Sequence, residues 1–270
     1  MTQVSRPANK RIELKNLSVV VGEPQSHAAR EIERQLSVLG MKNVRTFRNM
    51  DRVRHNVGTR EVDLFLCNMD GNEKETRAIF RGIRNQDVGR NPFLVMIPMV
   101  GSESEKTNKA TIDSGPDDFF YLPFRRDDFV LQVRDLAWNR RKFVAVSSYV
   151  GPTRWSSARP GGNSAEEFEV PNPVRAIGTG VSREDLRAEI TSCANALNLR
   201  KLNSDVSMIR SLADEIIPDY RNSNISEDFL RRIELMNTTI EVLCRRAGRL
   251  HFANLVSLCE LAGNRHHGNY

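Results

Sequence analysis

Polar residues follow two of the predicted strands, at positions where they could share a chemical task. The segment EVDLFLCNMDG (residues 61–71) has the pattern of a buried strand, and it ends at Asn68 with a carboxylate two residues on, at Asp70. An earlier apolar run, SVVVGEPQ, leads into Gly22 and Glu23. Carboxylate oxygens are the ligands that Mg²⁺ prefers, so Glu23 and Asp70 could together hold a divalent ion. An amide such as Asn68 neither ionises nor accepts a phosphoryl group, which limits the reactions open to this site.

Motifs of the common enzyme classes are missing from the chain. There is no Walker-type GxxxxGK, no GxGxxG, no GxSxG and no HExxH stretch. The cysteines form no CxxC pair and lie in apolar surroundings, so we expect buried free thiols rather than disulfides or metal ligands. We therefore expect a protein that is not an enzyme and that carries no metal or cofactor. The four cysteines are Cys67, Cys193, Cys244 and Cys259.

Short apolar runs alternate with amphipathic stretches from residue 14 to residue 145. This alternation is typical of βαβ units around a parallel sheet. Helical spacing is clear in SHAAREIERQLSVLG, KETRAIFRGIRNQ and RDDFVLQVRDLAWNRRKFV, which we expect to be crossover helices. In such a sheet the functional crevice lies beyond the carboxyl ends of the strands, where the polar residues above would meet. The predicted strands are 17–21, 43–47, 62–67, 93–98 and 119–122.

The second half of the chain has a different character. Proline, glycine and serine dominate residues 147–181, which predicts a linker or extended arm. Helical patterns follow, with Pro218 expected to stop the second helix and Ser226 to cap the third. Their apolar stripes need cover, so a helical bundle or a dimerising hairpin is implied. The predicted helices are 182–198, 203–217, 226–246 and 249–262, and the predicted domains are 1–146, the arm 147–181, a helical domain 182–262 and a tail 263–270.

The formal net charge of +6 lies entirely in the first half of the chain. Residues 1–150 hold 25 Lys and Arg against 19 Asp and Glu, whereas residues 151–270 hold 15 against 15. Between residues 42 and 60, six basic residues face the single acid Asp51; this basic region could attract nucleic acid or an acidic protein face, or be simply a solvated surface. No apolar run approaches the roughly 18 residues that span a bilayer, and no secretory leader is visible, so a cytoplasmic protein without membrane insertion is expected.

The order of several segments resembles a response-regulator receiver domain of the CheY-like kind. The resemblance covers residues 15–145 and implies an α/β, flavodoxin-like, five-stranded parallel-sheet receiver domain, here followed by a small all-α helical bundle domain. Receivers of bacterial two-component and phosphorelay signalling move a phosphoryl group from a partner kinase onto an aspartate after the third strand. They use Mg²⁺, two acidic residues, a hydroxyl and a lysine. The segments that carry the resemblance are SVVVGEPQ, LSVLGMKNVRTF, VDLFLCN, FRGIRNQDVGRNPFLVMI and SGPDDFFYLPF.

At the positions that match the family's active set, this sequence carries other residues. Only one carboxylate of the acidic pair remains, and neither the acceptor nor the lysine is present. The resemblance therefore implies a degenerate receiver that acts without phosphorylation, with Asp70 as a residual candidate site. The acidic pair falls on Gly22 and Glu23, the acceptor on Asn68 (or on Leu66 if NMDG is aligned with the family's exit from the third strand), the hydroxyl on Ile97 (or on Pro98 if the strand slips by one) and the lysine on Leu122.

The function expected from these residues is that of a bacterial signal-transduction adaptor or regulator that works through protein contacts. In the family the partner face would involve about residues 103–114 and 125–141, and we expect a homodimer through the C-terminal helices. One alternative is a nucleic-acid-binding regulator that uses the basic region 42–60. Another is a ligand sensor for a cyclic dinucleotide, because RRKFVAVSSYVGPTRW resembles an extension of some bacterial receivers. The arginines that would grip such a ligand are Arg140, Arg141, Arg154 and Arg159.

Overall fold

The computed structural model of the chain describes residues 12–101, 109–146, 149–154 and 166–252, with residues 255 and 257. It divides into two compact units. The first comprises Met1–Val144 and Tyr149–Cys193, and the second comprises Ala145–Ser148 and Ala194–Tyr270. The main change of unit therefore falls inside a helix, at residues 193 and 194, rather than at the predicted position between residues 181 and 182.

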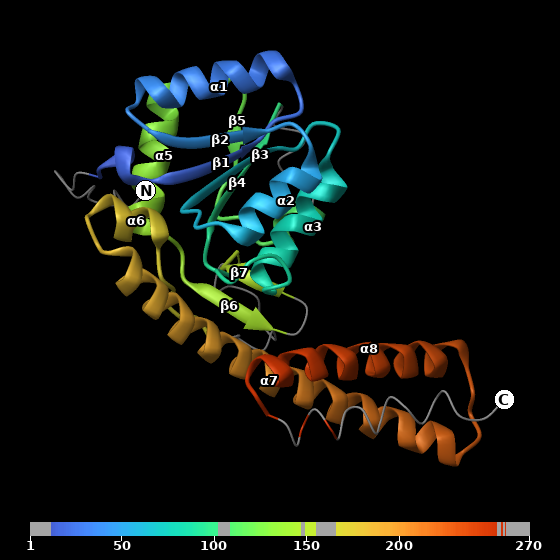
Figure 1. Cartoon of the computed structure of the whole chain (residues 1–270). Helices are drawn as coiled ribbons and strands as arrows, with labels where there is room; N and C mark the ends of the chain where they lie inside the picture. Colours follow the sequence, from blue (N-terminus) through green and yellow to red (C-terminus); the bar gives the residue numbers. More distant parts are fainter. Residues whose placement is uncertain are drawn as a thin grey trace, which may run out of the picture. The chain divides into compact units, whose positions relative to one another are not determined.

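A five-stranded parallel sheet forms the centre of the first unit (Figure 1). Its strand order is β2-β1-β3-β4-β5, with every neighbouring pair parallel. This is the flavodoxin-like order of doubly wound sheets, and it confirms the predicted fold class. The strands are β1 (Ser18–Gly22), β2 (Asn43–Phe47), β3 (Leu64–Asn68), β4 (Val95–Val100) and β5 (Phe120–Tyr121).

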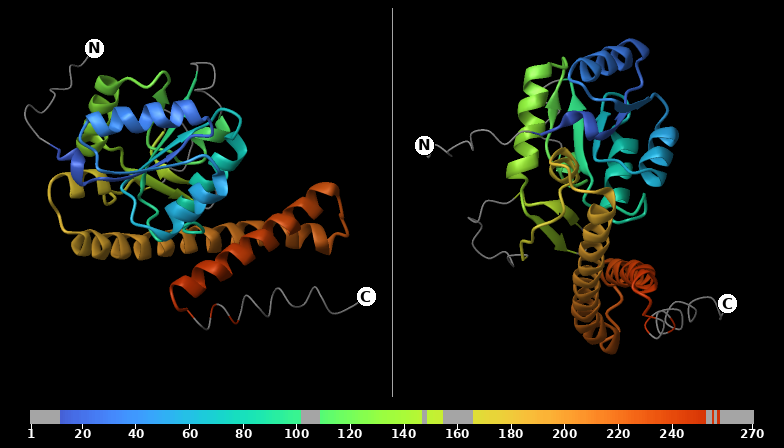
Figure 2. Two further views of the ribbon diagram at one scale, coloured as in Figure 1. Left: turned by 45° about the horizontal axis from the view of Figure 1, so that its top comes forward. Right: turned by 60° about the vertical axis from the view of Figure 1, so that its left-hand side comes forward.

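Helices cover both faces of this sheet, which is why the central strands are near-continuous apolar runs. Every residue of β3 and β4 is buried. Figure 2 shows α5 on one side of the sheet and α2 with α3 on the other. The helical elements of the first unit up to this point are η1 (Leu14–Asn16), α1 (Ser26–Val38), α2 (Met50–Thr59), α3 (Glu73–Arg84), α4 (Lys109–Ile112) and α5 (Arg126–Asn139).

Helix α2 was not among the predicted helices, although it occupies most of the basic region. Its first turn is capped by Asn49, whose side chain accepts a hydrogen bond from the N–H of Arg52 at 3.0 Å. Val53 and Val57, four residues apart, bury its inner face against the sheet. An N-cap followed by two β-branched residues is a weak signal, and the surrounding arginines obscured it.

The described part of the predicted linker or arm packs onto the first unit. Strands β6 (Phe143–Val146) and β7 (Tyr149–Pro152) form a two-stranded sheet, and Phe168 makes an antiparallel bridge to Phe143. A short helix, α6 (Pro173–Gly178), then lies on α5, where the Asn172 side chain donates to the Leu136 carbonyl at 2.8 Å. The remainder of residues 147–181 lies outside the described residues.

The second unit is a helical hairpin in its described part. Leu202 packs with Leu243 and Ala247, while Leu212 and Ile216 pack with Phe229, so the two helices run antiparallel. The helices are α7 (Arg183–Arg221), whose residues from Ala194 belong to this unit, and α8 (Glu227–Arg249).

Two predictions about these helices were wrong and one was confirmed. The first two predicted helices are a single 39-residue helix, because no glycine or proline interrupts residues 199–202. Pro218 lies inside α7 rather than ending it, and the helix continues for one more turn. Ser226 caps α8 as predicted, accepting from the N–H of Phe229 at 3.2 Å. Most of the predicted helix 249–262 and the tail lie outside the described residues.

Candidate functional site

The carboxyl edge of the sheet brings Glu23 and Asn68 into direct contact. Gly22 pairs with Cys67, so the residues that follow them emerge side by side from β1 and β3. The Asn68 amide nitrogen donates to Glu23 Oε2 at 2.8 Å, and the Gln25 N–H donates to Glu23 Oε1 at 2.9 Å. Both carboxylate oxygens of Glu23 are therefore hydrogen-bonded within the protein. This is needed because Glu23 is fully buried and Asn68 is only 2% exposed.

Asn68 uses both ends of its amide. Its nitrogen donates to Glu23, and its Oδ1 accepts a hydrogen bond from the N–H of Asp70 at 2.9 Å. A carboxylate at position 68 could accept this second bond but could not donate the first, and it would set two negative charges against each other in a buried site. The amide is therefore matched to Glu23 as the only acid of the pair.

Gly22, the other half of the degenerate acidic pair, has no room for a side chain. A Cβ atom at this position would lie 2.8 Å from Cys67 Sγ and 3.3 Å from Val53 Cγ2. A second carboxylate would require these neighbours to move. Burial raises the pKa of the Cys67 thiol to about 12, although a hydrogen bond to Thr76 opposes the shift, so this cysteine is an inert core residue at neutral pH.

Asn68 pairs with Met99 on β4, two residues beyond Ile97 and one beyond Pro98, the positions to which the resemblance assigns the hydroxyl. β4 runs on to Val100, so Ile97 pairs with Leu66 and Pro98 also lies within the strand. The predicted strand ended too early because Pro98 was taken as its limit. Met99 and Ile97 are both apolar and fully buried, so neither residue supplies a hydroxyl at this edge.

Leu122 directly follows β5 and donates its N–H to the Val100 carbonyl at 2.9 Å. Its side chain offers no charge at the position where the family carries a lysine. The strand ends on this side of the sheet thus present one carboxylate, one amide and apolar side chains.

Asp70 lies in a tight turn after β3. The Asn72 N–H donates to the Met69 carbonyl at 2.9 Å, and Gly71 adopts the positive φ of +73° that the third position of such a turn favours. The Asp70 carboxylate lies over Gly101, whose added Cβ would come within 3.3 Å of Oδ2. Among the described residues, no group of three or more His, Cys, Asp or Glu is placed to hold a metal ion.

The donor set at this edge does not fit the Mg²⁺ site that the family implies. The one buried carboxylate already accepts two hydrogen bonds, and the amide nitrogen of Asn68, not an oxygen, faces it. Mg²⁺ demands several oxygen ligands in near-octahedral geometry. As arranged, Glu23 and Asn68 form a buried pair in which a neutral amide donates to a carboxylate.

A second polar cluster lies at the other end of the strands, near the starts of β4 and β5. It was not predicted from the sequence. Asp117 precedes β5 and accepts from Arg84 of α3 at 2.9 Å and from Arg140 after α5 at 2.8 Å, as well as from the Met96 N–H at 2.8 Å. The Phe143 ring lies 4.9 Å from each guanidinium carbon. We call Arg84, Asp117 and Arg140 the buried triad; their side chains are at most 5% exposed.

Each member of the triad is held by further bonds. Arg84 donates to the carbonyls of Gly115, Pro92 and Leu94. Burial lowers the pKa of Arg84 to about 10, but this value is still well above 7, so the guanidinium stays charged at neutral pH. Burial alone would raise the pKa of Asp117, but Arg140 and Arg84 outweigh this and hold it below its ordinary value.

Of the four arginines predicted to hold a cyclic dinucleotide, Arg140 and Arg154 both bond to residues 116–117. Arg140 is committed to Asp117 and to the Pro171 carbonyl, and Arg154 donates to the Pro116 carbonyl. Arg141 is exposed, and Arg159 lies outside the described residues. The arginines that can be placed serve to fix the arm and the loop before β5.

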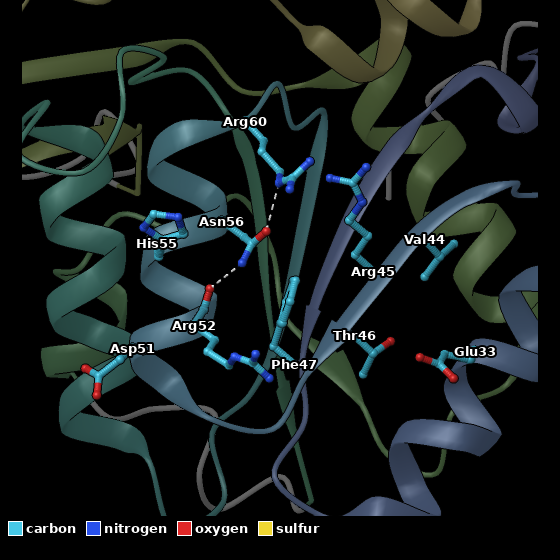
Figure 3. A pocket seen from close by; sticks show the side chains of 10 residues that line it. All are labelled: Glu33, Val44, Arg45, Thr46, Phe47, Asp51, Arg52, His55, Asn56 and Arg60. Carbon is cyan, nitrogen blue, oxygen red and sulfur yellow. Dashed lines mark hydrogen bonds between the residues drawn. The ribbon is translucent and has the colours of Figure 1, made fainter.

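The basic region borders a groove at the edge strand β2, with a volume of about 730 Å³. Figure 3 shows arginines from β2, from α2 and from the residue that follows α2 around it. Arg60 Nε donates to Asn56 Oδ1 at 2.9 Å, and Asn56 Nδ2 donates to the Arg52 carbonyl at 2.9 Å, so Asn56 holds Arg60 at the groove. The lining residues are Glu33, Val44, Arg45, Thr46, Phe47, Asp51, Arg52, His55, Asn56 and Arg60.

No family model matches the chain, and no curated protein matches it. Solved structures of receiver domains are similar to the first unit. A response regulator from Thermotoga maritima is 18% identical, with 45% of this chain and 97% of that chain covered and a TM-score of 0.39. The receiver domain of sensor histidine kinase PA1611 from Pseudomonas aeruginosa, whose structure holds a magnesium ion in the active site cleft, is 20% identical, with 46% and 97% covered and a TM-score of 0.39.

CheY4 of Vibrio cholerae is 11% identical, with 44% of this chain and 98% of that chain covered and a TM-score of 0.39. The matches thus take in nearly the whole of each receiver and less than half of this chain. They concern the fold, which the strand order establishes by itself. A search of the described helices for a membrane-spanning segment finds no candidate.

Proposed function

We propose that this protein is a regulator or adaptor of two-component signalling whose receiver-like unit works without phosphorylation. The observation that carries the proposal is the hydrogen bond from Asn68 to the buried Glu23 at 2.8 Å. It fills the place where an active receiver holds its metal and acceptor. Without a charged acceptor, a second acid or a lysine, the crevice has no groups to stabilise a transferring phosphoryl group.

The proposed output is contact with protein partners through the surface around β5 and α5. Tyr121 and Leu131 are large apolar side chains that remain exposed there, 39% and 55% respectively. The end of α5 is less available than the sequence suggested, because α6 lies on it and Arg175 stacks 5.0 Å over the Trp138 ring. Of the expected partner face, residues 103–108 lie outside the described residues.

We further propose that the second unit joins two copies of the chain. Leu199, Val206, Ala213 and Tyr220 follow one another at seven-residue intervals along α7, with Ile217 beside them. Residues at this interval share one face of a helix. All but Ala213 are exposed, so the hairpin presents an apolar stripe that a second copy can cover.

Treatment with a small phosphodonor and Mg²⁺, followed by intact-mass measurement, tests the central proposal. We expect no phosphorylated species. The double variant Asn68→Asp with Leu122→Lys, which restores the acceptor and the lysine, serves as the matched control for a revived site. A stable acyl phosphate on any aspartate of the natural chain would overturn the proposal, and Asp70→Asn would show whether Asp70 carries it.

A further inference from the structure

The outer edge of β2 has no strand beside it in the described sheet. β2 is the first strand in the sheet order, and the Glu23 N–H donates to the Phe47 carbonyl at 3.0 Å, so the backbone of Phe47 faces β1. Successive residues of a strand direct their backbone groups to opposite sides, and therefore the N–H and C=O groups of Val44 and Thr46 face outward. This edge offers hydrogen-bond donors and acceptors to an added strand.

The groove follows this edge, with walls from both faces of the sheet. Phe47 packs against the core beneath α2, so Arg45, two residues earlier, lies on the same side as α2. Thr46 lies on the opposite side, where Glu33 of α1 completes the wall. A ligand in the groove would thus contact the exposed edge of β2 together with side chains from two helices.

The groove carries an excess of positive charge. Three guanidinium groups line it, against the two carboxylates of Glu33 and Asp51. Arg45 and Arg52 are exposed, and neither forms an ion pair with another described residue. The hydroxyl of Thr46 is buried and finds no hydrogen-bond partner within the described structure. The groove therefore has unused charges and an unused hydroxyl beside an open backbone edge.

We propose that this groove binds an extended acidic segment of a partner protein as an added strand on β2. Backbone pairing with Val44 and Thr46 would supply affinity, and carboxylates directed toward Arg45, Arg52 and Arg60 would supply specificity. A protein segment fits better than a nucleic acid, because the one Phe, Tyr or Trp residue that lines the groove, Phe47, is packed against the core rather than free to stack on bases. A phosphodiester chain also lacks the alternating donors and acceptors that a strand edge pairs with.

Such an acidic segment would belong to a partner of the proposed adaptor, so the proposal rests on that function, but the two are tested separately. Peptide binding at β2 and phosphorylation at the carboxyl edge are measured independently. Failure of one therefore leaves the other standing.

The experiment is a fluorescence-anisotropy titration of the full chain with a library of labelled peptides of about six residues, in which Asp or Glu alternates with Val or Thr. We expect binding that weakens about tenfold or more in the double variant Arg45→Glu with Arg52→Glu. Arg54→Glu is the matched control, since Arg54 is an exposed arginine of α2 that does not line the groove, and it should change affinity less than about twofold.

Backbone pairing is tested first on the ligand, with the protein unchanged, and then on the strand itself. Methylation of alternate peptide nitrogens removes the donors that face β2 and should abolish binding in one of the two methylation registers. Thr46→Pro removes the outward N–H of the strand and should have a similar effect. The inference is overturned if no peptide binds at millimolar concentration or if methylation is harmless in both registers. It is equally overturned if only mixed oligonucleotides bind and the Arg45 and Arg52 variant abolishes that binding.

Discussion

At the scale of single residues, the amide of Asn68 and the buried carboxylate of Glu23 depend on each other. A fully buried carboxylate is tolerated only when its oxygens are hydrogen-bonded, and the Asn68 amide with the Gln25 N–H provides those bonds. The same amide anchors the turn after β3 through the Asp70 N–H. Asn68 is thus a structural donor at the position where the family places its acceptor.

Asn68→Asp should destabilise the fold at neutral pH by about 2 to 4 kcal/mol, because it sets a second buried carboxylate against Glu23 and removes the donor between them. The pKa of the shared pair would be raised in the folded state. The penalty is therefore present above the ordinary carboxyl pKa and shrinks as the pH falls toward it. Urea unfolding at pH 7 and at pH 5 measures both effects.

Asn222→Asp is the control for this experiment, because Asn222 is exposed at the end of α7 and the same change there should cost a few tenths of a kcal/mol at most. Equal stability of Asn68→Asp and the natural chain at pH 7 would contradict the assignment of Asn68 as the donor to Glu23.

The buried triad gives a second test at this scale. Asp117→Asn should cost about 3 to 5 kcal/mol, since it leaves Arg84 and Arg140 buried without a counter-charge. The pKa of Asp117 lies below its ordinary value of 3.8, so the ion pairs stabilise the fold above about pH 4, and this contribution is lost as the pH falls through the lowered pKa. The loss should appear in urea unfolding at pH 7, while the exposed neighbour variant Asp113→Asn should unfold like the natural chain.

At the scale of elements, the sequence predicted what local patterns carry and missed what depends on distant partners. The parallel sheet followed from apolar runs between amphipathic stretches. The ends of β4 and α7 did not, because Pro98 and Pro218 are tolerated inside elements that their neighbours hold in place. Arg84 could not be recognised as buried, since its partner Asp117 is 33 residues away.

The candidate site divides in the same way. The strand ends at Glu23 and Asn68 could be placed next to each other from the order of the strands, but only the structure gives the bond between them. The described part of the arm has no periodic pattern to predict its packing. Its contacts come from single residues such as Phe168 and Asn172.

Asn172 is the element-scale test of the arm. Its Oδ1 caps α6 by accepting the Arg175 N–H at 3.2 Å, while its Nδ2 donates to Leu136 of α5 at 2.8 Å. Asn172→Ala should cost about 1 to 2 kcal/mol and speed hydrogen exchange across α6. Asn172→Asp keeps the cap but loses the donor, so it should fall between Ala and the natural residue; equal exchange in all three proteins would show that α6 is held by other contacts.

At the scale of the whole molecule, the two units differ in charge and in the surfaces they expose. Residues 194–270 hold 10 Lys and Arg against 9 Asp and Glu, so almost all of the excess of basic residues lies in the first unit. The first unit therefore suits acidic protein segments. The second unit presents an apolar helix surface without an excess of either charge, which suits association with the same unit of a second copy.

The apolar stripe of α7 gives the prediction for the assembled molecule. If a second copy covers it, the full chain should have a dimer mass in light scattering coupled to size exclusion. Val206→Glu with Ile217→Glu should raise the dimer dissociation constant by about a hundredfold or more, because each buried side chain contributes about 1.5 to 3 kcal/mol. Met208→Glu is the matched control, since Met208 is exposed on a different face of the same helix and should leave the dimer intact. A monomeric natural chain, or equal weakening by Met208→Glu, would exclude the stripe as the contact between copies.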